Sequence, residues 1–449
     1  MVKAYETFKA ELFNRAKEKG FEDFELYYAG NNGFSVRVFK GEVAEYKNSN
    51  QEGVCFRGTY NGKMGYAYSE KMDSDIIDNI IENAIANAGI IEDEEVEKLY
   101  PGDEVYPEVN SYNESLNEID AAQKIEWALE MEKYALSLDP RVKMADYCTV
   151  SNSESSMALA NSYGLDLSGR RNMAVAYMIA RAEENGVTKS GYEFWAGRDF
   201  AEFDYKTLAK EAVNKALSYL GATSIPSGAY SVVFDQNTAM NIFQVFSRVF
   251  FAEAGQKGFS LLNKARIGET IAASIVTLRD DGVTQMSLES RAFDAEGVAT
   301  LNKAVIDNGV LKTLLYNTKS AEKDGVKSTG NAAKQGLSGT IATSVTNFYL
   351  VPGNNTREEI VSSVDKGVLI SELQGLHSGA NAVSGDFSFS ADGYLIENGK
   401  IVKPVEQITV AGNFFEMLKN IEAIGSDIRF SGNVGMPSIK VTELSISGL

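Results

Sequence analysis

The chain has 449 residues, of which 44% are hydrophobic, and its formal net charge at pH 7 is −19. This apolar content is enough for packed cores, so a wholly disordered protein is excluded, and the length suggests about two to four domains. An acidic surface repels phosphate backbones and anionic lipids, so we expect neither direct nucleic-acid binding nor membrane binding. The first residues are charged throughout and no apolar run approaches about 18 residues, so we expect a cytoplasmic protein.

The two cysteines exclude a disulfide framework. Cys55 and Cys148 lie in strand-like stretches. Free cysteines behave as small apolar residues and are among the most buried residue types. We therefore expect both to be reduced thiols in the core.

Residues 1–90 have the pattern of an N-terminal α+β domain. Phe8, Leu12 and Ala16 recur every four residues, which predicts a first helix. Strand-like runs follow, and Asn61-Gly62 is a strong signal for a two-residue hairpin. A second helix carries its apolar stripe between Ile76 and Ile85. Residues 91–118 then contain the acidic run 92–95 and little periodicity, which predicts an exposed acidic connector.

Residues 119–222 are predicted to form a central α+β domain, and residues 223–449 a large β-rich C-terminal domain. The central unit opens with a helix up to Leu138, continues with strands, and closes with a helix from Tyr205 to Leu220. The last unit includes a helix from Thr238 to Ala254 and is mostly strand beyond it, with one strand expected at Arg291 to Phe293. The apolar stripe of this helix is Ile242, Phe243, Phe246, Val249 and Phe250. The expected fold class is therefore α+β, with sheet-and-helix units followed by a β-rich domain.

The stretch from Gly375 to Asp427 draws attention because it holds the only histidine, His377, among many Gly, Ser and Asn residues. A single histidine excludes any multi-histidine zinc site, and it excludes any Ser/His/Asp triad or Cys/His dyad that does not use His377 itself. Carboxylate pairs, Ser/Lys dyads and oxygen-only metal sites remain possible. Asp280-Asp281-Gly282 offers carboxylates, but we interpret it as a turn between strands.

Several short motifs of the last unit form a specific combination. They are Phe293-Asp294-Ala295-Glu296-Gly297-Val298, Asp307-Asn308-Gly309-Val310-Leu311, Lys327-Ser328-Thr329-Gly330-Asn331-Ala332, Val383-Ser384-Gly385-Asp386-Phe387, Ile396-Glu397-Asn398-Gly399, Ile408-Thr409-Val410-Ala411-Gly412-Asn413 and Gly435-Met436-Pro437-Ser438-Ile439-Lys440-Val441. This combination resembles the third domain of the TldD/PmbA family. Val36-Arg37-Val38 with Gly41-Glu42-Val43 is similar to its first domain, so the resemblance spans nearly the whole chain.

The resemblance implies a place within that family. In its peptidase branch, TldD, a His-Glu-x-x-x-His motif binds zinc and its Glu acts as general base. When Glu253 is aligned with that Glu, Ala252 and Lys257 stand in place of the two histidines. The chain thus resembles the PmbA/TldE branch, historically called a modulator of DNA gyrase. That branch is implied to be the non-metal partner of TldD in a peptidase acting on unfolded or small peptides, so we expect no catalytic residue, metal or cofactor here.

Three hypotheses remain open at this point. The chain is a partner subunit of a TldD-like zinc peptidase, a stand-alone peptide-binding or structural homodimer, or a metal-independent hydrolase. For the first two, we expect His377, Gly379, Asn381 and Asn413 to face a peptide or the partner subunit, because small residues beside a strand edge let an extended peptide come close. The alternative is that the glycines of this segment only serve tight turns.

Overall fold

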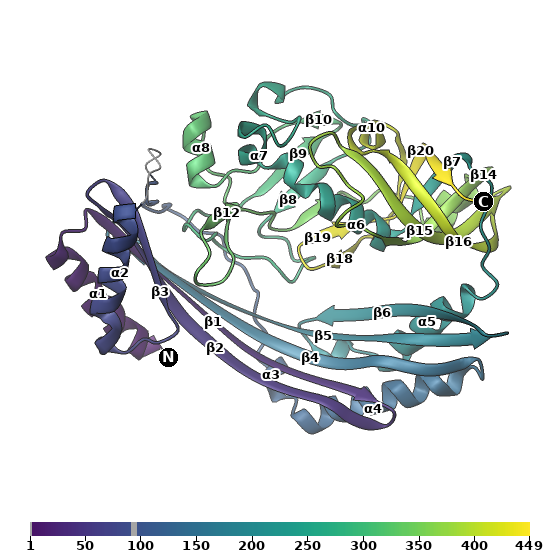
Figure 1. Ribbon diagram of the computed structural model, residues 1–449, viewed down its shortest axis with the longest axis horizontal. Helices are drawn as coiled ribbons and strands as arrows, with labels where there is room; N and C mark the ends of the chain where they lie inside the picture. Colours follow the sequence, from purple (N-terminus) through teal and green to yellow (C-terminus); the bar gives the residue numbers. More distant parts are fainter. Residues whose placement is uncertain (1, 91–96) are drawn as a thin grey trace.

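The computed structural model describes residues 2–90 and 97–449 (Figure 1). A long curved sheet forms one body, with helices on its outer face, and a larger domain lies over its concave face. Helices and strands are mixed in both bodies, which confirms the α+β expectation. No helix among the described residues is long and apolar enough to cross a bilayer.

The curved sheet is built from both predicted N-terminal units. Its strands are antiparallel in the order β3-β2-β1-β4-β5-β6, and β1 joins the units by pairing with both β2 and β4. The hairpin at Asn61-Gly62 has φ values of 51° and 73°, as a two-residue turn requires. The strand bounds are β1 Asp23–Phe39, β2 Glu42–Tyr60, β3 Lys63–Ser69, β4 Val142–Asn161, β5 Asp166–Glu184 and β6 Val187–Gly197.

Helices cover only one face of this sheet. Val36, Val150 and Ala176 are fully buried in one cluster with Ala128 and Met131 of α4. Because side chains alternate along a strand, the odd-numbered neighbours on β1, β4 and β5 lie on the other face, toward the C-terminal domain. Cys55 and Cys148 are buried free thiols, as expected. The helices are α1 Val2–Lys19, α2 Ile77–Ile90, α4 Ala121–Leu138 and α5 Tyr205–Ser218, with short turns at Ser74–Ile76 and Phe200–Glu202.

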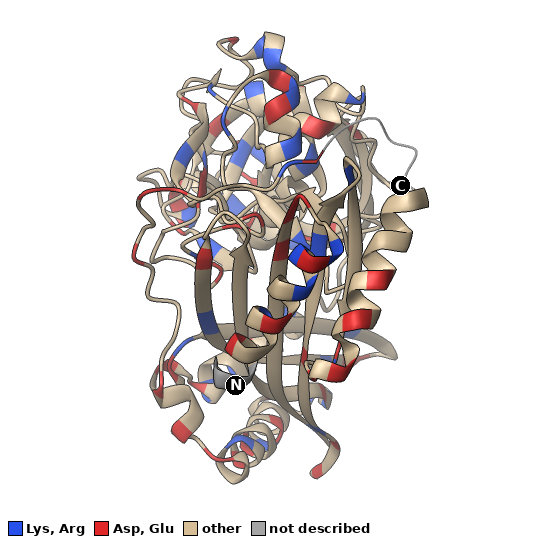
Figure 2. Cartoon of the chain, turned by 90° about the vertical axis from the view of Figure 1, so that its left-hand side faces the viewer, with Lys and Arg blue, Asp and Glu red and all other residues tan. Residues whose placement is uncertain are grey.

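Lys and Arg residues are interspersed with Asp and Glu residues along the ribbon on the side of the molecule that carries α1 and α2 (Figure 2). This distribution fits a solvated surface.

The described part of the connector packs against both bodies, which differs from the expected exposed segment. Leu99 is buried, and so is Leu116 in α3 (Ser115–Glu118). Asp103 accepts a hydrogen bond from the Ala299 amide at 2.8 Å, and the Tyr106 hydroxyl donates to the Gly297 carbonyl at 2.7 Å. The acidic run 92–95 lies outside the described residues.

The C-terminal domain contains two six-stranded sheets around one apolar core. Their orders are β16-β15-β14-β7-β20-β17 and β10-β9-β8-β13-β19-β18, and β11 pairs with β12. The strands are β7 Gly228–Phe234, β8 Leu278–Asp281, β9 Asn302–Asp307, β10 Val310–Leu311, β11 Ala332–Lys334, β12 Ile341–Thr343, β13 Phe348–Leu350, β14 Lys366–Gln374, β15 Asp386–Glu397, β16 Lys400–Asn413, β17 Ile421–Ile424, β18 Arg429–Ser431, β19 Val434–Met436 and β20 Ile439–Ser447. The short helices outside the 236–256 region are α8 Thr318–Asp324, α9 Arg357–Ser362 and α10 Phe414–Lys419.

The helix predicted from Thr238 to Ala254 is broken into three pieces. These are α6 Gln236–Phe246, a 3₁₀ turn Ser247–Phe250 and α7 Ala252–Gln256. Phe251 is extended because the segment on either side of it pairs with Leu315: the Leu315 amide donates to the Phe250 carbonyl at 2.8 Å, and the Ala252 amide donates to the Leu315 carbonyl at 2.9 Å. Tertiary pairing therefore overrides a continuous helical pattern. The predicted apolar stripe is nevertheless fully buried.

Candidate functional site

Helix α7 carries the positions that the family resemblance aligns with a zinc motif. Ala252 is buried and offers only a methyl group, whereas the Lys257 ammonium lies 2.5 Å from Oε1 of Glu253. Zinc in proteins is held by thiolate, imidazole or carboxylate groups, so an alanine and a protonated lysine are unsuitable ligands. No group of three or more His, Cys, Asp or Glu side chains that could hold a metal occurs among residues 2–90 and 97–449. The residues of α7 therefore do not fit a zinc ion.

The predicted site residues Gly379 and Asn381 lie in the hydrogen-bonded loop before β15, and Asn413, the last residue of β16, is bonded to that loop. A Cβ on Gly379 would lie 2.3 Å from the Ser388 carbonyl oxygen, which explains the glycine. Oδ1 of Asn381 accepts from the Val383 amide at 2.9 Å. His377 is exposed in the same loop.

Asn413 joins this loop to the helix that follows it. Its Oδ1 caps α10 by accepting from the Phe415 and Glu416 amides, and its Nδ2 donates to the Ser384 carbonyl at 2.8 Å. The role of these four residues toward a peptide or a partner stays a prediction.

A pocket of about 340 Å³ lies beside Asn413. Its far wall is formed by residues between 261 and 271, a few residues after α7. Its buried lining residues Leu262, Ile271 and Phe415 are apolar, an arrangement suited to an apolar side chain. The lining residues are Leu261, Leu262, Arg266, Ile271, Ser384, Asn413, Phe415, Glu416 and Lys419.

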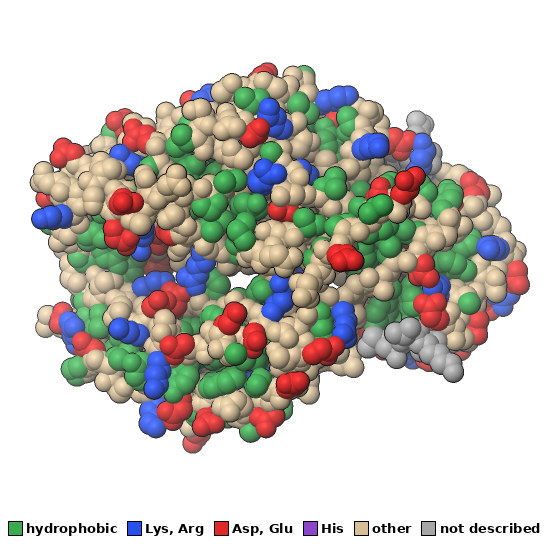
Figure 3. All heavy atoms as spheres, turned by 180° about the vertical axis from the view of Figure 1, so that it is seen from behind, with side chains coloured by type: hydrophobic (Ala, Val, Ile, Leu, Met, Phe, Trp, Pro, Cys, Tyr) green, Lys and Arg blue, Asp and Glu red, His purple; other side chains and the backbone are tan. Residues whose placement is uncertain are grey.

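A second hollow lies on the concave face of the curved sheet. Figure 3 shows openings between this sheet and the C-terminal domain, with Lys and Arg side chains at their edges. The hollow measures about 170 Å³ and is rich in small hydroxyl side chains from neighbouring strands. Its lining residues are Gly33, Phe34, Ser35, Lys47, Ser49, Ser151, Asn152, Ser153, Met173 and Val175.

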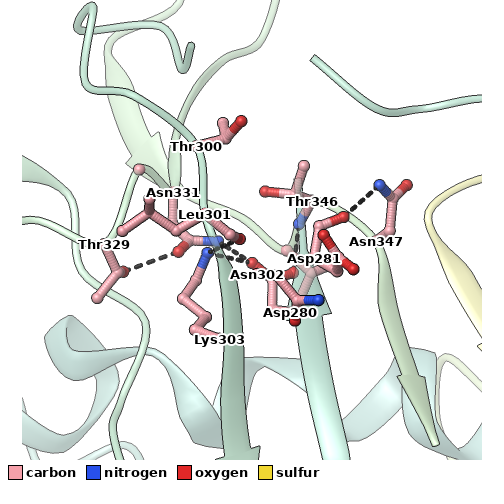
Figure 4. Close-up of polar contacts among 12 residues, drawn as sticks. Asp280, Asp281, Thr300, Leu301, Asn302, Lys303, Thr329, Asn331, Thr346 and Asn347 are labelled. Carbon is pink, nitrogen blue, oxygen red and sulfur yellow. Dashed lines mark hydrogen bonds and ion pairs between the residues drawn. The ribbon is translucent and has the colours of Figure 1, made fainter. Parts of the chain in front are cut away.

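A buried polar network surrounds Asp280 and Asp281, just before the loop 282–291 (Figure 4). Asp280 is fully buried; its Oδ1 accepts from the Thr346 amide at 2.6 Å, and its Oδ2 lies 2.7 Å from Nδ2 of Asn331 and 2.9 Å from Nζ of Lys303. The interpretation of residues 280–282 as a turn is therefore wrong for Asp280 and Asp281, which lie in β8, and only Gly282 lies in a turn. The sequence pattern misled because acidic residues are rare inside buried strands and need a matching cation.

The same network fixes both ends of the loop 282–291. Nδ2 of Asn347 donates to the Asp281 carbonyl at 2.6 Å and to the Ser290 hydroxyl at 2.9 Å, and the Thr300 hydroxyl donates to the Arg291 carbonyl. Residues 291–293 were expected to form a strand, but they form no strand here. The loop is held by these side-chain bonds and by a backbone bond between its ends, in which the Arg291 amide donates to the Gly282 carbonyl at 2.9 Å.

The carboxyl groups of Asp294 and Glu296 are buried where the C-terminal domain meets the curved sheet. Asp294 accepts from the amides of Glu296, Val298 and Ala332 at 2.8–3.0 Å. Burial, with Glu296 close by, nevertheless raises the pKa of Asp294 to about 7. On the sheet side, Nε of Arg57 lies 2.7 Å from Oε1 of Glu25.

Comparison with known protein families shows which family this chain belongs to. Residues 24–88, 114–220 and 227–448 match, in order, the models of domain 1, the central domain and the C-terminal domain of the PmbA/TldA metallopeptidases. A relative from Methanocaldococcus jannaschii, which is uncharacterised, is 30% identical over 96% of this chain and 97% of its own length. The chain belongs to the PmbA/TldD family.

Other members extend this comparison. The metalloprotease PmbA homologue of Haemophilus influenzae is 26% identical over 92% of this chain and 89% of its own. The crystal structure of a proposed modulator of a DNA gyrase from Thermotoga maritima is 30% identical, with a TM-score of 0.90 over 99% of this chain and 100% of its own. TldE from Thermococcus kodakarensis is 24% identical, with a TM-score of 0.89 over 98% of this chain and 100% of its own, and it shows the same fold.

Proposed function

We propose that this PmbA/TldD-family chain is the TldE/PmbA-like subunit of a TldD/TldE-type metallopeptidase that acts on unfolded or small peptides, and that it has no zinc site of its own. The observation that carries the proposal is the donor set of α7, where Ala252 and Lys257 stand at the histidine positions and Lys257 is paired with Glu253. Such a set cannot hold the zinc ion that would activate a water molecule for peptide hydrolysis.

The rest of the chain supports a role in holding a substrate. The concave cleft is open, and it is walled by strand backbones and small hydroxyl side chains. The pocket at Asn413 offers an apolar centre. In this role the chain contributes binding surfaces, while the zinc and its general base belong to a TldD-like partner subunit.

Elemental analysis of the purified full-length chain tests the metal part of the proposal. The matched control is a family relative that carries the complete His-Glu-x-x-x-His motif, purified and dialysed against zinc in the same way. We expect stoichiometric zinc in the control and none in this chain. One tightly bound zinc per chain here would contradict the proposal.

A further inference from the structure

Three arginines meet where the curved sheet faces the loop 282–291. Arg171 lies on β5, Arg198 follows β6, and Arg291 ends the loop. Nη1 of Arg171 forms an ion pair with Oε2 of Glu289, and Nη2 of Arg198 donates to the Leu288 carbonyl at 3.0 Å. The cluster is therefore assembled from the central unit and the C-terminal domain together.

These guanidinium groups have more donors than the described residues satisfy. Nε and Nη2 of Arg291 and Nε of Arg198 are buried and have no hydrogen-bond partner among the described residues. Nearly every buried donor in a folded protein is paired, because an unpaired donor loses its hydration without compensation. Buried, unpaired guanidinium donors where the curved sheet meets the C-terminal domain point to an acceptor supplied from outside the chain.

The local charge is positive although the whole chain is strongly acidic. Burial lowers the pKa of Arg198. The charge of Arg171 lowers this pKa further and that of Glu289 opposes the change, so both residues lie close enough to act on the Arg198 guanidinium. Arg291 and Arg171 both act on the Tyr27 hydroxyl, whose pKa is raised by burial. Two carboxyl groups lie near the three guanidinium groups: Glu289, which pairs with Arg171, and Asp294, on which Arg291 acts.

We propose that Arg171, Arg198 and Arg291 bind a carboxylate of a polypeptide held in the cleft, an inference that rests on the proposed peptide-handling function. A planar carboxylate matches the fork of a guanidinium and accepts from two of its donors at once. The acidic surface also repels polyanions.

The hollow on the curved sheet gives the peptide chain a place beside its carboxylate. Met173 lines that hollow and lies two residues from Arg171 on the same face of β5, a separation of about 7 Å. Ser153 and Ser155, which pair with these two residues on β4, continue the same face. The arginines therefore lie at one end of a surface lined with small side chains. The extended backbone of a bound peptide fits along this surface.

Arg291→Gln is the most informative variant, because the Arg291 side chain has buried donors that lack partners and its removal breaks no ion pair described here. The matched control is Arg170→Gln. Arg170 is next to Arg171 on the opposite face of the sheet, where it is exposed and pairs with Glu114. Thermal unfolding of both variants should match that of the wild type.

The probes are three peptides titrated calorimetrically into the full-length chain. They are N-acetylated penta-alanine with a free C-terminal carboxylate, its C-terminal amide, and that amide with Glu as its third residue. We expect a carboxylate-bearing peptide to bind more tightly than the neutral amide, with Arg291→Gln weakening it about ten- to hundredfold and Arg170→Gln leaving it unchanged. The two carboxylate peptides distinguish a chain terminus from an acidic side chain.

The inference is overturned, and the proposed function stands, if all three peptides bind equally well and Arg291→Gln binds like the wild type. If no peptide binds to any form of the chain, both the inference and the peptide-holding role fail. Inorganic phosphate that displaces the carboxylate peptide at lower concentration than acetate would also overturn the assignment.

Discussion

The guanidinium carbon of Arg429 lies 4.1 Å from the centre of the Phe194 ring, and the two residues belong to different bodies of the molecule. Arg429 is on β18 of the C-terminal domain, whereas Phe194 is on β6 of the curved sheet. Nη2 of Arg429 also donates to the Phe194 carbonyl and to Oε1 of the buried Glu193, both at 2.5 Å. This contact joins the two walls of the cleft on the side of β6.

Removing this contact should destabilise the protein. Arg429→Ala removes one of the two cations that pair with Glu193 among the described residues and leaves Lys215, so we expect the free energy of unfolding at pH 7 to fall by about 2–3 kcal/mol. Urea unfolding measures this change. Arg266→Ala, which removes an exposed pair with Glu269, is the control and should cost less than about 1 kcal/mol. Equal effects of the two variants would contradict the role of Arg429.

The same pair makes stability depend on acid pH. Burial alone would raise the pKa of Glu193, but Lys215 and Arg429 outweigh burial and hold this pKa below its ordinary value of 4.5. The contribution of ionised Glu193 to stability is therefore complete above pH 4.5 and is lost as the pH falls through the lowered pKa. In urea titrations from pH 6 downward, Arg429→Ala should lose less stability below pH 4.5 than the wild type. A parallel loss in both proteins would show that Glu193 is not involved.

Asp294 should make the free energy of unfolding depend on pH in the opposite direction, and at higher pH. Its pKa is raised from 3.8 to about 7 in the folded protein, so the folded state binds more protons than the unfolded state between these values. Stability from this group therefore decreases as the pH rises from about 4 to about 7. The Asp294→Asn variant, which cannot ionise at this position, should lack this component when urea unfolding is followed across that range. An unchanged slope in Asp294→Asn would contradict the raised pKa.

Phe246 should be among the most costly side chains to truncate. It is fully buried, and its ring stacks on that of Phe414 with centroids 4.6 Å apart. We expect Phe246→Ala to lower the free energy of unfolding by about 3–5 kcal/mol, because it leaves a cavity in the core. Phe259→Ala is the control, since Phe259 is 61% exposed and should change stability by less than about 0.5 kcal/mol. A cost below about 1 kcal/mol for Phe246→Ala would mean that this face is not core.

His377 provides a test of the loop before β15 that is free of folding effects. The side chain is exposed, so His377→Ala should leave thermal unfolding unchanged. If the loop faces a peptide or a partner, the variant should weaken calorimetric peptide binding or co-purification with a TldD-type subunit. Wild-type behaviour in both assays would show that this residue is part of the scaffold.

Local sequence signals predicted the turns and the core faces well. Asn61-Gly62, Asn308-Gly309 and Asn398-Gly399 all adopt the positive φ values of two-residue hairpins. These signals depend on the backbone preferences of two adjacent residues, so the rest of the chain hardly changes them. The apolar stripe that includes Phe246 was identified for a similar reason, because its spacing is local.

Features that depend on distant parts of the chain were not predictable. Neither Arg198 nor Arg291 belongs to a motif, and they meet only because β6 and the loop 282–291 face each other. Asp280 looked like a turn residue, since its partners Lys303, Asn331 and Thr346 are dispersed along the sequence. The boundaries of the three predicted units stay predictions.

Peptide cleavage by separate and mixed subunits tests the central claim most directly. This chain, a family relative with the complete His-Glu-x-x-x-His motif, and an equimolar mixture are each incubated with an unfolded peptide, with and without a zinc chelator. We predict no cleavage by this chain alone and chelator-sensitive cleavage by the mixture that exceeds that of the relative alone. Chelator-insensitive cleavage of the peptide by this chain alone would contradict the account.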